Sequence, residues 1–276
     1  MLVLLKLDNL IEGQIIKRPS KHIKSPYVAD VLCNEQELLC HSPSLGCCGL
    51  ADSNSQILIS ENKNTSKCSH TIYLSIIKHN DQEIIIGIHP KLAEQLTEHA
   101  LTSNLLSKLT NITNYKRETV IRVKEHVDSR FDFTGIDQHG IPFIMEVKNV
   151  PLADYEDVTA KDRKHMDFSN RDFNSKVAYF PDGYRKHKTE PVSPRALKHI
   201  KELTFIKQHT NIRCLMCYVI QRTDVNRFQP SIIDPEYRSA FKDAVSVGVE
   251  IITLVVQWNR NGEAIFIRDD LPIVSY

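Results

Sequence analysis

Asp132, Glu146 and Lys148 have the residue types and spacing of a cation site beside an amine. Two carboxylates directly opposite each other in a hairpin are destabilising unless something neutralises them. Mg²⁺ does this well, because it accepts one or two carboxylates, keeps several waters and leaves room for phosphate oxygens. Lys148 and Arg130 would be the adjacent positive groups, suited to orienting a water or stabilising a pentavalent phosphate. The alternative is a solvated charged face on which Arg130 and Lys148 simply pair with the acids.

A single β-hairpin is expected to bring these residues together. Residues Ser129–Val150 form two strand-like runs around Gln138-His139-Gly140, and glycine at the end of a three-residue loop supplies the positive φ required there. This turn pairs Ile136 with Pro142 and, counting back along both strands, places the two acids opposite each other. Because side chains alternate along a strand, Lys148 shares their face. The pairs expected on the core face are Phe131 with Val147 and Phe133 with Met145.

The composition is that of an ordinary globular chain: 276 residues, 41% hydrophobic and 25% charged, enough for one large domain or two small ones. The formal net charge of +1 does not indicate a polyanion partner, so any nucleic-acid surface must arise from local clustering. Lys6 and Asp8 interrupt the apolar run at the N-terminus, which resembles neither a membrane span nor a signal peptide. We therefore expect a cytoplasmic protein with no membrane partner.

The cysteines and short motifs exclude several classes of site. Seven cysteines, an odd number without a secretion signal, indicate reduced thiols. Cys214 and Cys217 form a CxxC inside an apolar run with no second CxxC to complete a zinc site, so we expect buried thiols. No GxGxxG, GxxxxGKS/T or GxSxG sequence occurs, which leaves dinucleotide-binding, P-loop and hydrolase-elbow sites without support.

Residues 1–89 are expected to form an OB-like β-barrel, because many short strands at close spacing favour a small barrel. A basic cluster precedes the strand that begins at Tyr27. In single-strand-binding barrels such a cluster grips phosphates while the aromatic ring stacks a base, although basic loops also occur without any partner. The basic residues are Lys17, Arg18, Lys21 and Lys24. The expected strands are Leu2–Leu7, Gln14–Lys17, Tyr27–Cys33, Glu37–His41, Gln56–Ser60, Thr71–Lys78 and Glu83–Ile88.

Residues 90–276 are expected to form a mixed sheet flanked by helices, an α+β or α/β arrangement. Pro90 suits the first turn of a helix, and the apolar residues after it have helical spacing. Residues 151–192 lack apolar periodicity and are expected to be a mobile insertion with a short strand at Val177–Phe180. The expected helices are Lys91–Leu109, one opening at Ser193-Pro194, and Pro235–Val247; the further strands are Glu118–Lys124, Cys214–Gln221 and Glu250–Gln257.

The chain resembles the sugar fermentation stimulation protein (SfsA) family over most of its length, most strongly in the C-terminal two thirds. Several separated matches in the right order are far more specific than one short motif. The matching stretches are Ser129-Arg130-Phe131-Asp132-Phe133, Glu146-Val147-Lys148-Asn149-Val150, Phe180-Pro181-Asp182, Lys198-His199 with Glu202-Leu203, and the run from Gln221-Arg222 through Asp234-Pro235-Glu236-Tyr237 to Gly248-Val249-Glu250.

The resemblance implies an OB-type barrel followed by a domain with the PD-(D/E)XK nuclease fold, the fold of restriction endonucleases, and it implies DNA binding. It implies Asp132, Glu146 and Lys148 as the metal and catalytic positions, and a barrel that contacts nucleic acid through the Lys17–Tyr27 region. Two features of the barrel depart from the family pattern. A Cys-Pro-Asn-Thr-Gly stretch is replaced by residues 42–49, and the usual basic-aromatic pattern near the N-terminus becomes Lys17-Arg18-Pro19-Ser20.

Two functions remain open on these grounds. The first is a Mg²⁺- or Mn²⁺-dependent phosphodiesterase acting on DNA, and the second is a non-catalytic DNA-binding regulator that retains the nuclease fold. An RNA partner is a third hypothesis, because OB barrels also bind RNA. No separate organic cofactor is expected, and a homodimer is one open oligomeric state. Further phosphate contacts are expected from Arg130, Arg195, Lys198 and the basic stretch Arg185-Lys186-His187-Lys188.

Overall fold

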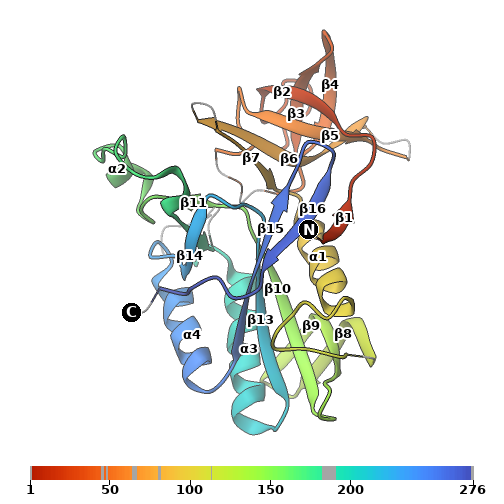
Figure 1. Cartoon of the computed structure of the whole chain (residues 1–276), viewed down its shortest axis with the longest axis vertical. Coiled ribbons are helices and arrows are strands. Elements are labelled where there is room, and N and C mark those ends of the chain that lie inside the picture. The colour runs from red at the N-terminus through yellow and green to blue at the C-terminus, as the bar shows by residue number, and fades with distance from the viewer. Residues whose placement is uncertain are drawn as a thin grey trace.

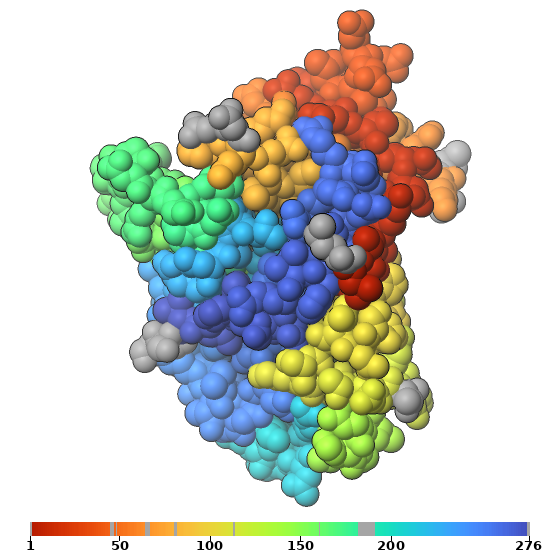
Figure 2. Space-filling model, in the orientation of Figure 1, coloured from red at the N-terminus to blue at the C-terminus, as the bar shows by residue number. Residues whose placement is uncertain are grey.

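The computed structural model describes residues 2–44, 47, 49–63, 67–79, 82–112, 114–181 and 191–274. A six-stranded barrel lies at one end of the molecule, and a seven-stranded sheet with helices on its faces forms the other part (Figure 1). The space-filling view shows the C-terminal region, in blue, reaching up against the barrel, in red and orange (Figure 2). This arrangement confirms the predicted fold class of an OB-like barrel followed by a nuclease-like sheet.

The barrel strands run in the order β4-β3-β2-β5-β6-β7, and an additional parallel pairing of β4 with β6 closes the sheet. Its core is rich in β-branched side chains, which pack well on a pleated surface. Fully buried examples are Ile15, Ile57, Ile59, Ile72 and Ile86. The strands are β2 (Ile11–Lys17), β3 (Val28–Cys33), β4 (Gln36–His41), β5 (Gln56–Glu61), β6 (His70–His79) and β7 (Gln82–Gly87).

The large sheet has three parallel strands at its centre and antiparallel strands at both edges, in the order β1-β16-β15-β13-β10-β9-β8. β13 is buried on both faces and reads as a continuous apolar run, as parallel strands covered on both sides do. The strands are β1 (Val3–Lys6), β8 (Asn114–Val123), β9 (Val127–Ile136), β10 (Pro142–Val150), β13 (Arg213–Ile220), β15 (Glu250–Trp258) and β16 (Glu263–Arg268).

Three helices cover the sheet, with α1 (Pro90–Thr102) on one face and α3 (Pro194–His209) and α4 (Pro235–Ser246) on the other. Alternate residues of β10 show this division, because Met145 packs with the α1 cluster and Ile144 with the α3 and α4 cluster. Each helix has proline in its first turn, where the missing N–H costs no hydrogen bond. Within the described ranges, no helix combines the length and the apolar character needed to cross a bilayer.

A third, three-stranded sheet organises the segment that was expected to be a mobile insertion, and one of its strands is the short strand predicted at Val177–Phe180. The strands β11 (Ala153–Asp154), β12 (Lys176–Phe180) and β14 (Val225–Pro230) pair with one another, and α2 (Ala160–Arg163) and a 3₁₀ turn (Phe173–Ser175) precede β12. Lys176 forms a buried ion pair of 2.6 Å with Asp224, which also binds Arg222. These long-range contacts hold residues 153–180 and have no signature in local apolar periodicity.

Further elements differ from the sequence predictions. The first helix ends at Thr102 and not at Leu109, because the chain turns at Asn104 with φ of 57°. Three strands, β11, β14 and β16, had not been predicted. The N-terminal strand β1 pairs with β16 in the large sheet, so the predicted domain 1–89 contributes one strand outside its barrel.

The barrel and the large sheet meet where Gly87 at the end of β7 approaches Gln221 after β13. The Gly87 N–H donates to the Gln221 carbonyl at 3.3 Å. The Gln221 side chain accepts from Trp258 Nε1 at 2.8 Å and donates from Nε2 to Asn149 Oδ1 at 2.7 Å. Gly87 permits this approach, since a Cβ atom here would lie 1.8 Å from Gln221 Oε1.

Candidate cation and phosphate site

The hairpin that carries the acids has the predicted turn and register. Ile136 pairs with Pro142, and the pairing continues to Phe133 opposite Met145. Gly140 closes the loop with φ of +78°, and its N–H donates to the Asp137 carbonyl at 3.0 Å. The regular turn sets the register that brings the two acids to the same level of the sheet.

Beyond the Phe133–Met145 pair the two strands separate. The backbone N–H of Val147 donates to Asp132 Oδ2 at 2.7 Å, and this side-chain contact takes the place of a ladder bond to β9. The predicted pairing of Phe131 with Val147 is therefore wrong: Phe131 packs with the α3 cluster and Val147 with the α1 cluster. The separation opens the hairpin at the level of the acids.

Glu146 points toward α3 and is 2% exposed. Its Oε1 accepts from Lys148 Nζ and also contacts Nδ1 of His199 on α3. Its Oε2 is buried and has no hydrogen-bond partner among the described residues. Burial raises the pKa of Glu146, but Lys148 and His199 outweigh that effect and hold the pKa below its ordinary value. Glu146 is therefore an ionised carboxylate with one unused oxygen.

Asp132 has the opposite electrostatic setting. Burial, followed by the charge of Glu146, raises its pKa from 3.8 to about 7, against the opposing effects of Lys148 and the Val147 N–H. Two neighbouring acids whose pKa values shift in opposite directions are typical of functional sites. Burying two carboxylates side by side costs folding free energy, which a purely structural role would not require. A second ionised carboxylate at this place would be stabilised by added positive charge.

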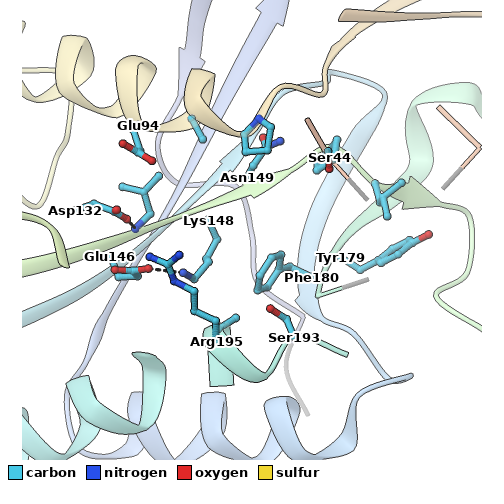
Figure 3. A pocket seen from close by; sticks show the side chains of 16 residues that line it. Ser44, Glu94, Asp132, Glu146, Lys148, Asn149, Tyr179, Phe180, Ser193 and Arg195 are labelled. Atoms are coloured by element: carbon cyan, nitrogen blue, oxygen red, sulfur yellow. Dashed lines mark hydrogen bonds and ion pairs between the residues drawn. The ribbon is translucent and has the colours of Figure 1, made fainter. Parts of the chain in front are cut away.

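Asp132, Glu146 and Lys148 line one cavity of about 320 Å³. Figure 3 shows Asp132 and Glu146 at one end of it and Ser44 and Tyr179 at the other, with Lys148 and Phe180 between them. Glu94 of α1 also lines the cavity and pairs with Arg117 at 3.0 Å. The three residues predicted to come together thus line one cavity, and the carboxylates of Asp132, Glu146 and Glu94 that line it are oxygen donors of the kind that a hard cation takes.

Of the further predicted phosphate contacts, Arg195 reaches this cavity and two others do not line it. The Arg195 side chain extends from the start of α3 toward Glu146 and Lys148 (Figure 3). Lys198 donates to the Asp128 carbonyl at 2.6 Å, and Arg130 pairs with Glu118 at 3.2 Å. The predicted basic stretch of residues 185–188 lies outside the described residues.

The comparisons with known proteins agree with this architecture. The family described as "Sugar fermentation stimulation protein RE domain" matches residues 91–262. The chain belongs to this family. Sugar fermentation stimulation protein homologs from Nostoc punctiforme and Clostridium perfringens are 27% and 28% identical over 247 and 250 residues, covering 88% and 90% of this chain and 87% and 90% of theirs. A solved structure of Pyrococcus furiosus SfsA in complex with Ca²⁺ covers all of both chains with a TM-score of 0.75 and 20% identity.

In this member of the sugar fermentation stimulation protein family, the side chains of the predicted basic cluster of the barrel differ: some are exposed at the surface, and others bind partners within the barrel. Lys17, Lys24 and Tyr27 are exposed, with Tyr27 at 41%. Lys21 pairs with Glu37 at 2.6 Å. The Arg18 guanidinium instead donates to three backbone carbonyls, those of Pro26, Ala51 and Ser44, at 2.8, 3.3 and 2.5 Å. Arg18 therefore holds the barrel loop whose Ser44 forms part of the cavity wall.

Sequence reasoning about this family member missed two contributors to the site. His199 appeared only within a stretch that matches the family, and its contact with Glu146 joins residues 53 positions apart. Ser44 comes from a barrel loop, and nothing in its own sequence context indicates that it reaches the sheet. The helical spacing of Arg195 and His199, which places both on the side of α3 that faces the acids, was the available signal for His199.

Proposed function

We propose that this chain is a Mg²⁺- or Mn²⁺-dependent phosphodiesterase that acts on DNA. The observation that carries the proposal is the unused Oε2 of the buried Glu146, a residue that lines one cavity together with Asp132 and Lys148. A buried carboxylate oxygen without a partner costs free energy, so it is retained where a ligand satisfies it. An oxygen of this charge and hardness is a ligand for a divalent cation and not for a soft metal.

The residues present fit such a cation. The donors are carboxylate oxygens. The raised pKa of Asp132 indicates that the positive charge around it is too small to stabilise its ionised form, which a bound cation would do. The related Pyrococcus furiosus protein is described in complex with Ca²⁺, another cation that takes oxygen ligands. When bound, the cation supplies Lewis-acid polarisation of a phosphoryl oxygen and lowers the pKa of a coordinated water.

The chain's own groups then have distinct tasks. Asp132 and Glu146 hold the cation, and the Val147 N–H fixes the orientation of the Asp132 carboxylate. Lys148 pairs with Glu146 and, with 12% of its side chain exposed, faces the cavity, where its ammonium can orient a water or stabilise charge on phosphate. Arg195 adds a guanidinium suited to phosphate oxygens.

Binding of DNA by the barrel is part of the same proposal. Lys17, Lys24 and Tyr27 are all exposed, so this stretch offers an aromatic ring for stacking a base and two ammonium groups for phosphates. The alternative function, a DNA-binding regulator without turnover, uses this surface and leaves the acids without a catalytic task.

The deciding experiment incubates the purified protein with single-stranded DNA, duplex DNA and RNA in Mg²⁺, Mn²⁺ or EDTA, beside Asp132→Asn and Lys148→Met. Metal-dependent cleavage by the wild type and its loss in both variants supports the phosphodiesterase. Binding without cleavage of any substrate, unchanged by EDTA and by both substitutions, overturns it in favour of the regulator. Cleavage of RNA alone would contradict the assignment of DNA as substrate.

A further inference from the structure

Helix α3 contacts both strands that carry the acids, on the side where those strands separate. The ladder between β9 and β10 ends at the Phe133–Met145 pair. Past this pair, three side chains of α3 reach the two strands: Lys198 and Glu202 contact β9, and His199 contacts β10. The position of one strand relative to the other therefore depends on the helix as well as on the hairpin.

Lys198 and Glu202 fix α3 to β9 by binding both backbone groups of Asp128. Glu202 Oε1 accepts from the Asp128 N–H at 2.9 Å, and Lys198 Nζ donates to the Asp128 carbonyl at 2.6 Å. The two side chains lie one turn apart on the helix and pair with each other at 3.6 Å. Glu202 is 5% exposed, so water competes little for its hydrogen bond. These contacts fix the place from which the rest of the helix reaches β10.

His199 extends from this part of α3 to Glu146 on β10. The residue is buried, its ring lies 5.8 Å from the ring of Phe131 between centroids, and its Nδ1 contacts Glu146 Oε1. The low pKa of Glu146 makes it an ionised carboxylate, which only accepts hydrogen bonds, so Nδ1 of His199 is the donor. A ring packed in a core has little freedom to move and therefore holds its partner in one place.

Lys148 donates to the same oxygen of Glu146 but is a less rigid support. It follows Glu146 by two residues on one strand, and its ammonium lies at the end of a flexible four-carbon chain that is 12% exposed. Both donors bind Oε1, whereas Oε2 has no hydrogen-bond partner among the described residues. Two donors on one oxygen fix the plane of the carboxylate and leave the other oxygen to the cation of the proposed function.

From these contacts we infer that His199 is a positioning residue of the cation site, which holds the Glu146 carboxylate in the orientation that binds a divalent cation. The inference rests on the cation site of the proposed function and adds a residue to it. A hydrogen bond to a ligating carboxylate orients that ligand, and its loss typically lowers metal affinity or activity by about 10- to 100-fold. A histidine with a purely structural role would affect the stability of the fold and leave the affinity for the cation unchanged.

Titrations with Mn²⁺ followed by electron paramagnetic resonance test this inference on His199→Leu and His199→Asn. Leucine fills much of the space of the ring without a donor, whereas the amide nitrogen of asparagine lies as many bonds from Cβ as Nδ1 does and can donate to Glu146. We expect the leucine variant to bind Mn²⁺ about 10- to 100-fold more weakly than the wild type. The asparagine variant should recover most of the affinity. His209→Leu is the matched control at the other end of α3, where His209 binds the Phe205 carbonyl, and should bind Mn²⁺ as the wild type does.

Thermal melts establish that each variant is folded at the temperature of the titration. If the leucine variant does not fold, His199→Gln replaces it, because the glutamine amide lies one bond further from Cβ and cannot take the place of Nδ1. A folded leucine or glutamine variant with the Mn²⁺ affinity of the wild type, or equal losses in the asparagine and leucine variants, overturns the inference and leaves the phosphodiesterase standing. Absence of Mn²⁺ binding by the wild type overturns the cation site and the inference together. Mn²⁺ binding by the wild type without cleavage of any nucleic acid overturns the phosphodiesterase alone.

Discussion

The Asp132 carboxylate accepts a hydrogen bond of 2.7 Å from the backbone N–H of Val147, at the level where β9 and β10 separate. One side chain thereby satisfies a backbone donor that would otherwise pair across the hairpin. The ladder between β9 and β10 stops at the Phe133–Met145 pair, just before this contact and Glu146. The separation of the strands beside the two acids is therefore linked to one side-chain hydrogen bond.

Asp132→Asn should stabilise the metal-free protein at high pH. The pKa of Asp132 is raised from 3.8 to about 7, so the folded state keeps a proton that the unfolded chain releases near pH 4. The ionised Asp132 carboxylate therefore lowers the free energy of unfolding. This effect is absent below pH 4, grows between pH 4 and 7, and is complete above pH 7, with an upper bound of about 4 kcal/mol. Asparagine can still accept the Val147 N–H and carries no charge. Urea denaturation in EDTA at pH 4 and pH 8 measures this, and an equal effect at both pH values would contradict it.

Lys148→Met should separate catalysis from binding. Methionine keeps much of the side-chain volume while removing the ammonium that pairs with Glu146 and faces the cavity. Cleavage should fall by about 10²- to 10³-fold, the usual effect of losing one group that stabilises developing charge. The affinity for DNA should change little, because the exposed basic residues of the barrel lie elsewhere. Single-turnover rates and anisotropy titrations give the two quantities, and a loss of affinity as large as the loss of rate would argue against this division.

Arg18→Lys and Lys17→Gln should have different consequences although both residues belong to one basic cluster. Arg18 holds three backbone carbonyls, so lysine in its place should reduce the free energy of unfolding by about 1–3 kcal/mol and weaken the cavity wall at Ser44. Lys17 is exposed, so its substitution should leave the melting temperature unchanged and reduce the salt slope of DNA binding by about 1. Thermal melts and binding titrations at several salt concentrations check both, and an unchanged melting temperature in Arg18→Lys would refute the anchoring role.

Gly87→Ala should lower both stability and activity, whereas Gly140→Ala should lower stability alone. A Cβ atom at Gly87 would lie 1.8 Å from Gln221 Oε1, and Gln221 holds Asn149, which lines the cavity. The overlap should cost about 1–3 kcal/mol. Gly140 has open space around it but φ of +78°, which costs a non-glycine residue about 1–2 kcal/mol at the tip of the hairpin. Denaturation curves and cleavage rates of the two variants make the comparison, and normal cleavage by Gly87→Ala would disconnect Gln221 from the site.

The sequence was sufficient for the parts of the site that local rules control. The turn at Gly140 sets the register of the hairpin up to the Phe133–Met145 pair, and counting residues thus brought Asp132 and Glu146 to one cavity, although the ladder ends before the predicted pairing of these two acids. The separation of the strands did not follow, because it depends on a side chain replacing a ladder bond. Contacts between distant segments could not be predicted either. His199 contacts Glu146 only after α3 packs on the sheet. Arg18 points inward because backbone carbonyls of other segments, such as that of Ser44, accept its hydrogen bonds. The same reason explains β1, whose partner β16 lies at the opposite end of the chain.

The most direct test of the cation site is a titration with Mn²⁺ followed by electron paramagnetic resonance, comparing the wild type with the double variant Asp132→Asn and Glu146→Gln at pH 8. The wild type should bind about one Mn²⁺ per chain at this site and compete for it with Mg²⁺, because the two carboxylates supply its protein ligands. The double variant should lose that binding while remaining folded. Equal Mn²⁺ binding by both proteins, or none by the wild type, would contradict the account.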